Sequence, residues 1–364
     1  MVINSNFWKN KKVLLTGHTG FKGSWLSIWL KKLEVELIGF SKDIPTEPSL
    51  FKLAEVSENM ISIIGDIKNF SLIQKTIQEN QPDIIIHMAA QSLVRKSYED
   101  PLETFSTNII GTANVLESIK MSEKTRVVIN VTSDKCYENN GMEEKFSENS
   151  PMGGYDPYSS SKGCSELITS AFKNSFYNSK KFDSHKVSLS TVRAGNVIGG
   201  GDWSPNRIVP DCVRSWSKNK HVILRSPKST RPWQHVLDIV YGYMTLAIKL
   251  KQNPKLHGEA FNFGPDKNNF RVIDVLNKIK FYWPKITWRI KKQKKFKENN
   301  LLHLNSNKSK KLLKWKTVLN FSNSVKFTVE WYKHYLKNKR DIYHFSLSQI
   351  SKYQDILKKN SNIL

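Results

Sequence analysis

The chain has 364 residues, of which 39% are hydrophobic and 24% are charged, and its formal net charge is +25. These fractions are typical of a globular protein and exclude a disordered chain, and the length predicts about two to three domains. The longest apolar stretches are too short for a bilayer and the N-terminus shows no apolar signal region, so we expect a cytoplasmic protein that does not bind membranes.

The basic excess is concentrated late in the chain, where residues 289–316 contain eleven Lys or Arg and one acid, Glu298. Such a run can bind nucleic acid, an acidic membrane surface or a phosphate-bearing ligand. A nucleic-acid site would normally interleave aromatic and basic residues on a recognisable module, and no such module is apparent. We therefore expect a solvated lysine-rich surface and no nucleic-acid partner. The three cysteines fit neither a zinc site nor a disulfide framework, so no metal is expected.

Short β-branched runs alternate with helical patterns over the first two-thirds of the chain. Strands are predicted at residues 12–16, 35–40, 60–64, 83–87, 126–132 and 186–193. Between them lie helical stretches, for example one in which Leu102, Phe105, Ile109, Ala113 and Leu116 share a face. Near-continuous apolar strands separated by helices predict an α/β fold with a Rossmann-type doubly wound parallel sheet.

After about residue 196 the alternation breaks up into a smaller α/β lobe. Strands are predicted at 222–225 and 261–264, and helices near 271–281 and 323–336. We expect a dinucleotide-binding domain with the catalytic residues over 1–195, a substrate lobe mainly over 196–340 and partly interleaved with the first domain, and a helical tail over 341–364. In the tail, Ile350, Tyr353, Ile356 and Leu357 recur at helical spacing, which fits either a packing helix or a subunit contact.

A glycine-rich turn, Gly17-His-Thr-Gly-Phe-Lys-Gly23, follows the first strand and opens a helix. Glycines three residues apart permit the turn, admit a pyrophosphate against backbone N–H groups and let the helix approach the sheet. The turn predicts a dinucleotide cofactor. The residues expected to hold it here are Gly17, Thr19, Gly20, Phe21, Lys22 and Gly23.

Later strand ends supply further candidates for the cofactor site. Asp66 and Ile67 follow the third strand and can bind adenine, whereas Ala89, Ala90 and Gln91 end the fourth strand. Asn108 is a candidate in the next helix, although a buried amide usually has a structural partner. Ser41-Lys42-Asp43 after the second strand offers both an acid for ribose hydroxyls and a cation for a 2′-phosphate, so the choice between NAD and NADP stays open.

Tyr158 and Lys162 form a candidate catalytic pair. Asp156 can cap a helix that has Pro157 at its first position, which puts both side chains on one helical face. We expect the lysine to lower the pKa of the phenol from its ordinary value near ~10 and so to produce a general base for a sugar or alcohol hydroxyl. Lys162 would also contact the cofactor, as would Tyr158.

Ser133, Asp134 and Lys135 end the fifth strand. The Ser133 hydroxyl can share the substrate proton with Tyr158, while Asp134 and Lys135 add a carboxylic acid and an amine base. A dehydrogenase needs only the first of these, so the triplet indicates chemistry beyond oxidation. Alternatively, Asp134 and Lys135 form a salt bridge at the strand end and take no part in chemistry.

The glycine turn, the serine and the Tyr-x-x-x-Lys pair resemble the extended short-chain dehydrogenase/reductases, a family that includes nucleotide-sugar epimerases and dehydratases. The resemblance covers roughly residues 8–340. Among the 4,6-dehydratases of this family it is strongest to the branch that acts on CDP-glucose, in the segments Gly17–Leu26, Thr132–Tyr137, Arg193–Trp203 and Arg231–Val236. Related dehydratases of dTDP- or GDP-sugars carry Asp-Glu where this chain has Asp134-Lys135, and the CDP-glucose branch is where a lysine is expected.

The resemblance implies a hydro-lyase that uses NAD in an internal redox cycle: oxidation at C4, loss of water across C5 and C6, and reduction at C6. It implies that Lys135, directly or through water, removes the C5 proton and that Asp134 protonates the departing hydroxyl. It further implies a homodimer and a nucleotide-sugar substrate whose diphosphate contacts Arg231. Asn196, after the sixth strand, and Arg207 are further candidates for this contact, although each, and Arg207 above all, can instead belong to a surface or interlobe salt bridge. The alternatives are a 4-epimerase or reductase, which needs neither Asp134 nor Lys135, and a non-catalytic dinucleotide-sensing or nucleic-acid-binding protein.

Overall fold

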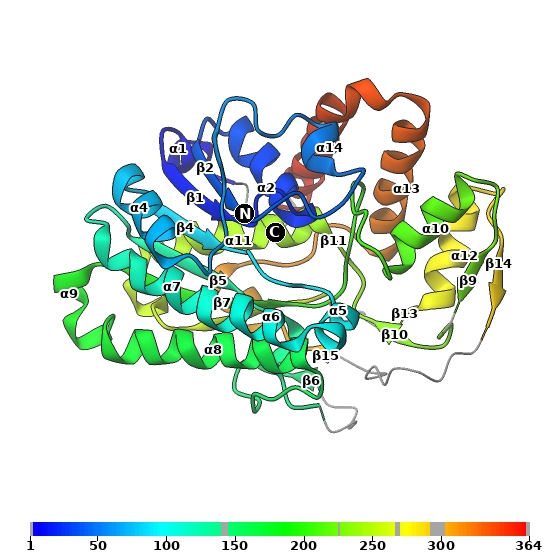
Figure 1. Cartoon of the computed structure of the whole chain (residues 1–364). Helices are drawn as coiled ribbons and strands as arrows, with labels where there is room; N and C mark the ends of the chain where they lie inside the picture. Colours follow the sequence, from blue (N-terminus) through cyan, green and yellow to red (C-terminus); the bar gives the residue numbers. More distant parts are fainter. Residues whose placement is uncertain (1–2, 140–144, 225, 266–269, 292–302, 362–364) are drawn as a thin grey trace.

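A seven-stranded parallel sheet forms the centre of the computed structural model, which describes residues 3–139, 145–224, 226–265, 270–291 and 303–361 (Figure 1). The strand order is β12-β7-β5-β4-β1-β2-β3. The strands are β1 Lys12–Thr16, β2 Glu36–Ser41, β3 Ile61–Ile64, β4 Ile84–His87, β5 Val127–Val131, β7 Ser188–Ala194 and β12 Ala260–Phe263. Because the order reverses between β1 and β4, the sheet is doubly wound, and the predicted fold class is confirmed.

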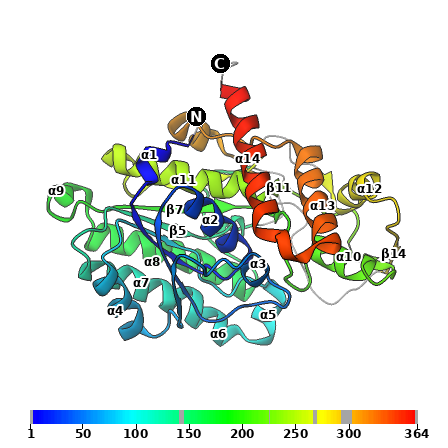
Figure 2. The same ribbon diagram turned by 90° about the horizontal axis from the view of Figure 1, so that it is seen from above.

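Helices cover both faces of the sheet. On one face lie α4 Phe70–Asn80, α7 Gly111–Ser118 and α8 Pro157–Ser175, and on the other lie α2 Phe21–Lys32 and α11 Val236–Gln252 (Figure 2). Alternate strand residues feed two separate cores: Leu14 packs in the core that includes α4 and α7, whereas Leu15 packs in the core that includes α2 and α11. This burial on both faces explains the near-continuous apolar strands in the sequence.

Further helices and short strands complete the described part of the chain. The other helices are α1 Ser5–Trp8, α3 Leu50–Leu53, α5 Val94–Glu99, α6 Pro101–Phe105, α9 Phe182–His185, α10 Ile208–Trp216, α12 Val272–Tyr282, α13 Phe321–Lys337 and α14 Ile342–Ser361. Two-stranded pairs are formed by β6 Lys145–Phe146, β8 Val197–Ile198, β9 Val222–Leu224, β10 Thr230–Arg231, β11 Gln234–His235, β13 Phe270–Arg271, β14 Trp288–Ile290 and β15 His303–Leu304. Most of these pairs involve residues beyond 196, but β12 from the same region joins the large sheet beside β7. No helix within the described ranges is long and apolar enough to cross a membrane.

The helical face predicted from Leu102 to Leu116 is wrong at its first residue, because Leu102 is 76% exposed. The reason is a π-helical turn, Ser106–Ile110, between α6 and α7. A π turn contains an extra residue, so side chains before and after it do not keep one α-helical stripe.

The C-terminal helix α14 packs on its own chain. Ile350 and Tyr353 are fully buried, and the Tyr353 ring meets Trp29 of α2 edge-on with 5.5 Å between the ring centroids. The Tyr353 hydroxyl donates a hydrogen bond to Asp238 Oδ1 of α11 at 2.9 Å. The apolar stripe of the tail is therefore a packing face within the chain.

Asp238 makes folding stability depend on pH. Its Oδ1 also accepts from the Val318 N–H at 2.6 Å, and burial raises the pKa of its carboxyl to about 7 from an ordinary 3.8. The folded chain thus binds this proton more tightly than the unfolded chain. The free energy of unfolding therefore decreases as pH rises from the ordinary pKa of 3.8 through about 7.

Asp238→Asn keeps the acceptor oxygen but has no proton to lose. We expect the melting temperature of this variant, relative to that of the parent protein, to increase as pH rises. Thermal melts between about pH 5 and about pH 8 test this, and a constant difference would contradict it.

Candidate active site

The glycine turn forms a close-packed cradle at the edge of β1. Gly17 has a φ of 79°, and an added Cβ would lie 2.8 Å from the backbone nitrogen of Ala89. At Gly23 a Cβ would lie 2.1 Å from the carbonyl oxygen of Gly17, so α2 approaches the loop in a way that only glycine allows. Helix α2 begins at Phe21 with no side-chain cap on its first N–H groups. These groups are available to an anion, and the cradle therefore fits a pyrophosphate.

Thr19 and Lys22 connect the cradle to its surroundings. The Thr19 hydroxyl donates to the Asp43 carbonyl oxygen at 2.6 Å and so holds the loop after β2. Burial lowers the pKa of Lys22 to about 8, with a further decrease from Arg207 and an opposing effect from the Asp134 carboxylate. Lys22 therefore lies within electrostatic range of the triplet. Phe21 lies against Gly199, where a Cβ would come within 3.1 Å of the phenyl ring.

Asp66, which is expected to bind adenine, belongs to a cluster of four charged residues. Lys42 Nζ lies 2.8 Å from Glu103 Oε1 and 3.4 Å from Asp66 Oδ2, and Lys68 pairs with the same two acids. Hydrogen bonds from both lysines lower the pKa of Glu103 to about 2. Ile67 is buried beside them, and its carbonyl oxygen accepts from Asn114 Nδ2 at 3.0 Å. The lysine that the sequence offers to a 2′-phosphate is thus already paired with carboxylates.

Asn108 binds protein groups rather than open space. Its Oδ1 accepts from the Gln91 N–H at 2.8 Å, and its Nδ2 donates to the Gln91 carbonyl oxygen and to Ser161 Oγ. The amide therefore ties the chain after β4, with Ala90 and Ala89 just before Gln91, to helix α8. Asn108 thus holds the backbone of Gln91, which is itself a candidate cofactor residue.

Tyr158 and Lys162 lie on the buried face of α8. The helix begins as predicted, since Asp156 Oδ1 accepts from the Ser159 N–H at 2.9 Å and Pro157 is the first helical residue. Both side chains are buried, and Lys162 Nζ donates to the Val131 carbonyl oxygen at 3.2 Å, at the end of β5.

The expected lowering of the Tyr158 pKa is wrong for the protein alone. Burial raises the pKa of this phenol to about 12, and the Asp134 carboxylate raises it further, whereas a hydrogen bond with Ser133 and the charge of Arg207 act in the opposite direction. Lys162 is not among these influences, and burial together with the nearby Lys22 lowers the pKa of Lys162 to about 8. Desolvation of the phenolate outweighs the helical neighbour.

The triplet meets Tyr158 at the carboxyl end of β5. Ser133 hydrogen-bonds Tyr158 and donates to Asp134 Oδ1 at 3.0 Å. Asp134 is 2% exposed, and its Oδ2 has no hydrogen-bond partner among the described residues. Lys135 Nζ lies 3.8 Å from Asp134 Oδ1, so the salt bridge considered from sequence does form. The second carboxylate oxygen nevertheless stays unpaired beside the candidate base, as a proton donor to a substrate would.

The candidate substrate residues lie around this edge. Arg207 Nη1 binds Asp202 Oδ2 at 3.0 Å and acts electrostatically on Tyr158. Asn196 has a buried Oδ1 with no hydrogen-bond partner in the part of the chain described. Arg231 is buried in β10 and donates to the Thr230 carbonyl oxygen. Its neighbour Pro232 packs on Gly195, and Gly195 also faces Asp134 Oδ2.

No group of three or more His, Cys, Asp or Glu in the described ranges is arranged to hold a metal.

Sequence reasoning missed Glu166 and Arg193, which form a buried ion pair between α8 and β7. It also missed Asp202, the partner of Arg207, and Glu103, the partner of Lys42. One signal was available: Arg193 stands in an otherwise uncharged buried strand, and a buried guanidinium requires an anionic partner.

Comparison with known proteins identifies relatives that match nearly the whole chain. Residues 14–328 match the family described as GDP-mannose 4,6 dehydratase. The CDP-glucose 4,6-dehydratase of Salmonella typhimurium is 43% identical, covering 97% of this chain and 98% of that protein. The human dTDP-D-glucose 4,6-dehydratase is 26% identical, covering 91% and 93%.

Solved structures share the fold. The epimerase Mth375 of Methanothermobacter thermautotrophicus superimposes with a TM-score of 0.80 at 21% identity, covering 93% of this chain and 96% of that one. The dTDP-glucose 4,6-dehydratase of Bacillus anthracis, in complex with NAD, gives 0.73 at 23% identity, covering 88% and 96%. The chain therefore belongs to the NAD-dependent nucleotide-sugar epimerase and dehydratase family, within the group described as GDP-mannose 4,6 dehydratase.

Proposed function

We propose that the protein is a CDP-glucose 4,6-dehydratase that converts CDP-glucose to CDP-4-keto-6-deoxyglucose and water. The observation that carries the proposal is the buried Asp134 carboxyl, with one unpartnered oxygen among the described residues, between Lys135 and the Ser133–Tyr158 pair. An epimerase or reductase needs no acid and amine at this position. The 43% identity to a CDP-glucose 4,6-dehydratase supports the same substrate.

The cradle supports NAD as the resident cofactor. Gly17 and Gly23 leave room where any side chain would collide with backbone, and the uncapped start of α2 supplies N–H donors for a pyrophosphate. When bound, NAD supplies the hydride acceptor for C4 and the hydride donor for C6. We propose that residues 1–195 with β12 hold NAD and that residues 196–340 mainly hold the sugar nucleotide. We further propose that α14 stabilises both parts by packing against α2 and α13.

Tyr158 is the proposed base for the C4 hydroxyl. Ser133 shares a hydrogen bond with it and can hold the same substrate oxygen. The positive charge of Arg207 near the phenol favours the phenolate. Loss of the hydroxyl proton to Tyr158 accompanies loss of the C4 hydride, which leaves a C4 ketone and a more acidic C5 hydrogen.

Asp134 and Lys135 are the proposed acid and base of the elimination. The step needs a neutral amine at Lys135 and a protonated carboxyl at Asp134. This form contains the same number of protons as the observed ion pair, so a proton shift from Lys135 to Asp134 produces it without any exchange with water. Lys135 then removes the C5 proton, and Asp134 protonates the C6 hydroxyl as it leaves.

The diphosphate of the substrate would meet Arg207 and Arg231, with Asn196 beside them. A guanidinium gives bidentate contacts to phosphate oxygens, and the buried Oδ1 of Asn196 can accept from a ribose or sugar hydroxyl. Specificity for cytosine is proposed from the relative alone. We also propose a cytoplasmic homodimer, which analytical ultracentrifugation tests for the assembly.

Preference for NAD over NADP is expected to depend on Glu103. Lys42 and Lys68 are held by Glu103 and Asp66, so neither lysine is free to bind a 2′-phosphate. Glu103→Gln removes one negative charge from the cluster of two lysines and two acids, so the cluster then carries a net positive charge. We expect the affinity of the apoprotein for NADP⁺ to rise about two- to fivefold, with little change for NAD⁺, because an exposed charge contributes up to about 1 kcal/mol.

Calorimetric titration of the apoprotein with both dinucleotides measures this preference. Glu117→Gln is the control, because Glu117 pairs with Lys120 on the surface of α7. An unchanged ratio of the two affinities in Glu103→Gln would show that this charge cluster does not set cofactor choice.

Incubation with CDP-glucose tests the proposed function. The expected product is a 4-keto-6-deoxyhexose nucleotide, detected by its chromophore in alkali, with no net release of NADH. Formation of an epimerised hexose alone would contradict the dehydratase and support the epimerase. Unchanged CDP-, UDP-, dTDP- and GDP-sugars would favour a protein that binds a dinucleotide without catalysis.

A further inference from the structure

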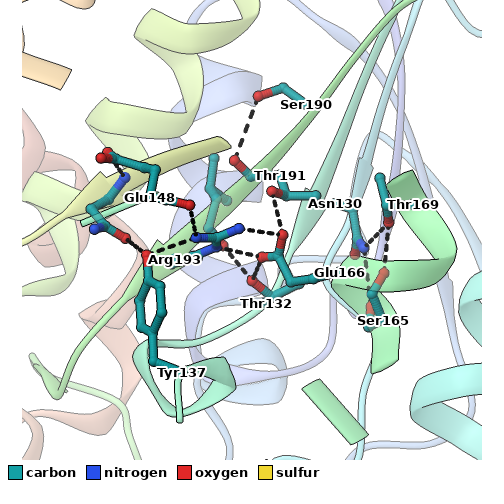
Figure 3. A network of polar contacts seen from close by, with 12 residues as sticks. Asn130, Thr132, Tyr137, Glu148, Ser165, Glu166, Thr169, Ser190, Thr191 and Arg193 are labelled. Atoms are coloured by element: carbon teal, nitrogen blue, oxygen red, sulfur yellow. Dashed lines mark hydrogen bonds and ion pairs between the residues drawn. The ribbon is translucent and has the colours of Figure 1, made fainter. Parts of the chain in front are cut away.

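Glu166 and Arg193 form a buried ion pair within a larger network of polar contacts (Figure 3). Arg193 Nε donates to Glu166 Oε1 at 2.8 Å, and Nη2 donates to Oε2 at 2.8 Å, which is the bidentate arrangement. Glu166 is 6% exposed and Arg193 is 4% exposed. Glu166 follows Lys162 by one turn of α8, so the pair joins the helix of Tyr158 and Lys162 to strand β7.

The carboxylate of Glu166 also holds the residue before the triplet. Thr132 Oγ1 donates to Oε1, and Thr191 Oγ1 donates to Oε2 at 2.7 Å. Each carboxylate oxygen therefore accepts from one nitrogen and one hydroxyl. This full set of donors compensates for the loss of hydration on burial. Because Thr132 is joined directly to Ser133, Glu166 on α8 fixes the position of the triplet at the end of β5.

Arg193 holds the other end of the same segment. Its Nη1 donates to the Tyr137 hydroxyl oxygen at 2.7 Å and to the Glu148 carbonyl oxygen at 3.1 Å. The Tyr137 hydroxyl in turn donates to Asn262 Oδ1 at 2.7 Å, in β12. Tyr137 follows the short helical turn Asp134–Cys136 directly. The Glu166–Arg193 ion pair therefore hydrogen-bonds Thr132 and Tyr137, which flank the triplet on its two sides.

We propose that Glu166 and Arg193 are positioning residues for the elimination step. They do not touch the substrate but set the distance between the triplet and the Tyr158–Lys162 face. A misplacement of about 1 Å can cost about 10²-fold in rate, because a proton transfer needs its partners within hydrogen-bonding reach. Elimination uses Asp134 and Lys135, both in the held segment, whereas C4 oxidation uses Tyr158 on α8 and, from that segment, only Ser133. Loss of the pair should therefore slow elimination more than oxidation.

Glu166→Gln tests the proposal, which rests on the proposed dehydratase activity. The amide is nearly isosteric but places an N–H₂ group against one of the donors from Arg193, Thr132 or Thr191. We expect kcat on CDP-glucose to fall about 10- to 100-fold with KM changed by less than about threefold. We also expect enzyme-bound NADH to accumulate in a single turnover, because oxidation outruns elimination.

The control is Thr169→Val, one turn further along the same buried face of α8. Thr169 accepts a hydrogen bond from Asn130 Nδ2 at 2.8 Å and makes no contact with residues 132–137 through it. This variant should lower the melting temperature without NADH accumulation. Tyr137→Phe, which removes only the hydroxyl bonds to Arg193 and Asn262, provides a second variant should Glu166→Gln fail to fold, and the same partition is expected on a smaller scale.

The outcomes separate the two proposals. Absence of product with the parent protein overturns the dehydratase assignment itself. Normal product with the parent, but no NADH accumulation in Glu166→Gln and Tyr137→Phe, overturns the positioning role alone. Equal accumulation in Thr169→Val also overturns it, since any loss of a buried hydrogen bond in α8 would then have the same effect.

Discussion

Replacing Asp134 by asparagine, or Lys135 by methionine, is expected to stop the reaction after C4 oxidation. Neither change removes Tyr158 or Ser133, so the first hydride transfer still occurs. The asparagine amide cannot donate a proton to the leaving hydroxyl, and the methionine thioether cannot remove the C5 proton. Loss of a general acid or base costs about 10²- to 10⁴-fold, so kcat should fall by that factor while NADH absorbance builds up on the enzyme.

The Asp134 variant also carries a prediction for pH dependence. The carboxylate is among the groups that raise the pKa of Tyr158, so its removal lowers that pKa. The phenolate then forms at lower pH, and the pH profile of the first hydride transfer should shift toward acid in Asp134→Asn. Stopped-flow absorbance across a pH series measures both the NADH accumulation and the shift of the pH profile.

Asp238→Asn is the control, because it makes the same change at a different buried carboxyl. Asp238 lies in α11, and its hydrogen bonds go to α14 and to the chain near Val318. Normal turnover in both triplet variants would refute the roles given to them.

Tyr158→Phe is expected to abolish the reaction at its first step. Without the phenol, the proposed acceptor of the C4 hydroxyl proton is gone, and kcat should fall about 10²- to 10⁴-fold. Unlike the Asp134 and Lys135 variants, this one should show no NADH in a single turnover, because the block precedes hydride transfer. Tyr155→Phe serves as the control, since Tyr155 is 72% exposed and lies just before the same helix. NADH accumulation in Tyr158→Phe would show that another group is the base.

The strands and the cradle were predictable because their signals are local. Apolar runs between helical patterns mark the strands of a covered sheet, and the glycines around Gly17 can be read within seven residues of sequence. The meeting of Tyr158 with Ser133 follows from the same pattern, because the carboxyl ends of parallel strands lie at one edge.

The features that sequence did not predict depend on burial and on distant partners. The pKa of Tyr158 is set by desolvation and by Asp134, not by its helical neighbour Lys162. The partner of Lys42 is Glu103, 61 residues away, and the partner of Arg193 is Glu166 on a different element. Spacing along the chain carries no information on such pairs until the fold brings them together.

Transfer of hydrogen within one substrate molecule tests the central claim most directly. CDP-glucose deuterated at C4 is incubated with the protein, and the product is analysed by mass spectrometry and NMR. An internal redox cycle in which NAD stays bound predicts that the deuterium is recovered at C6 of the 4-keto-6-deoxy sugar. Recovery of the label at C4 of an epimerised hexose, or its loss to free NADH, would contradict the account.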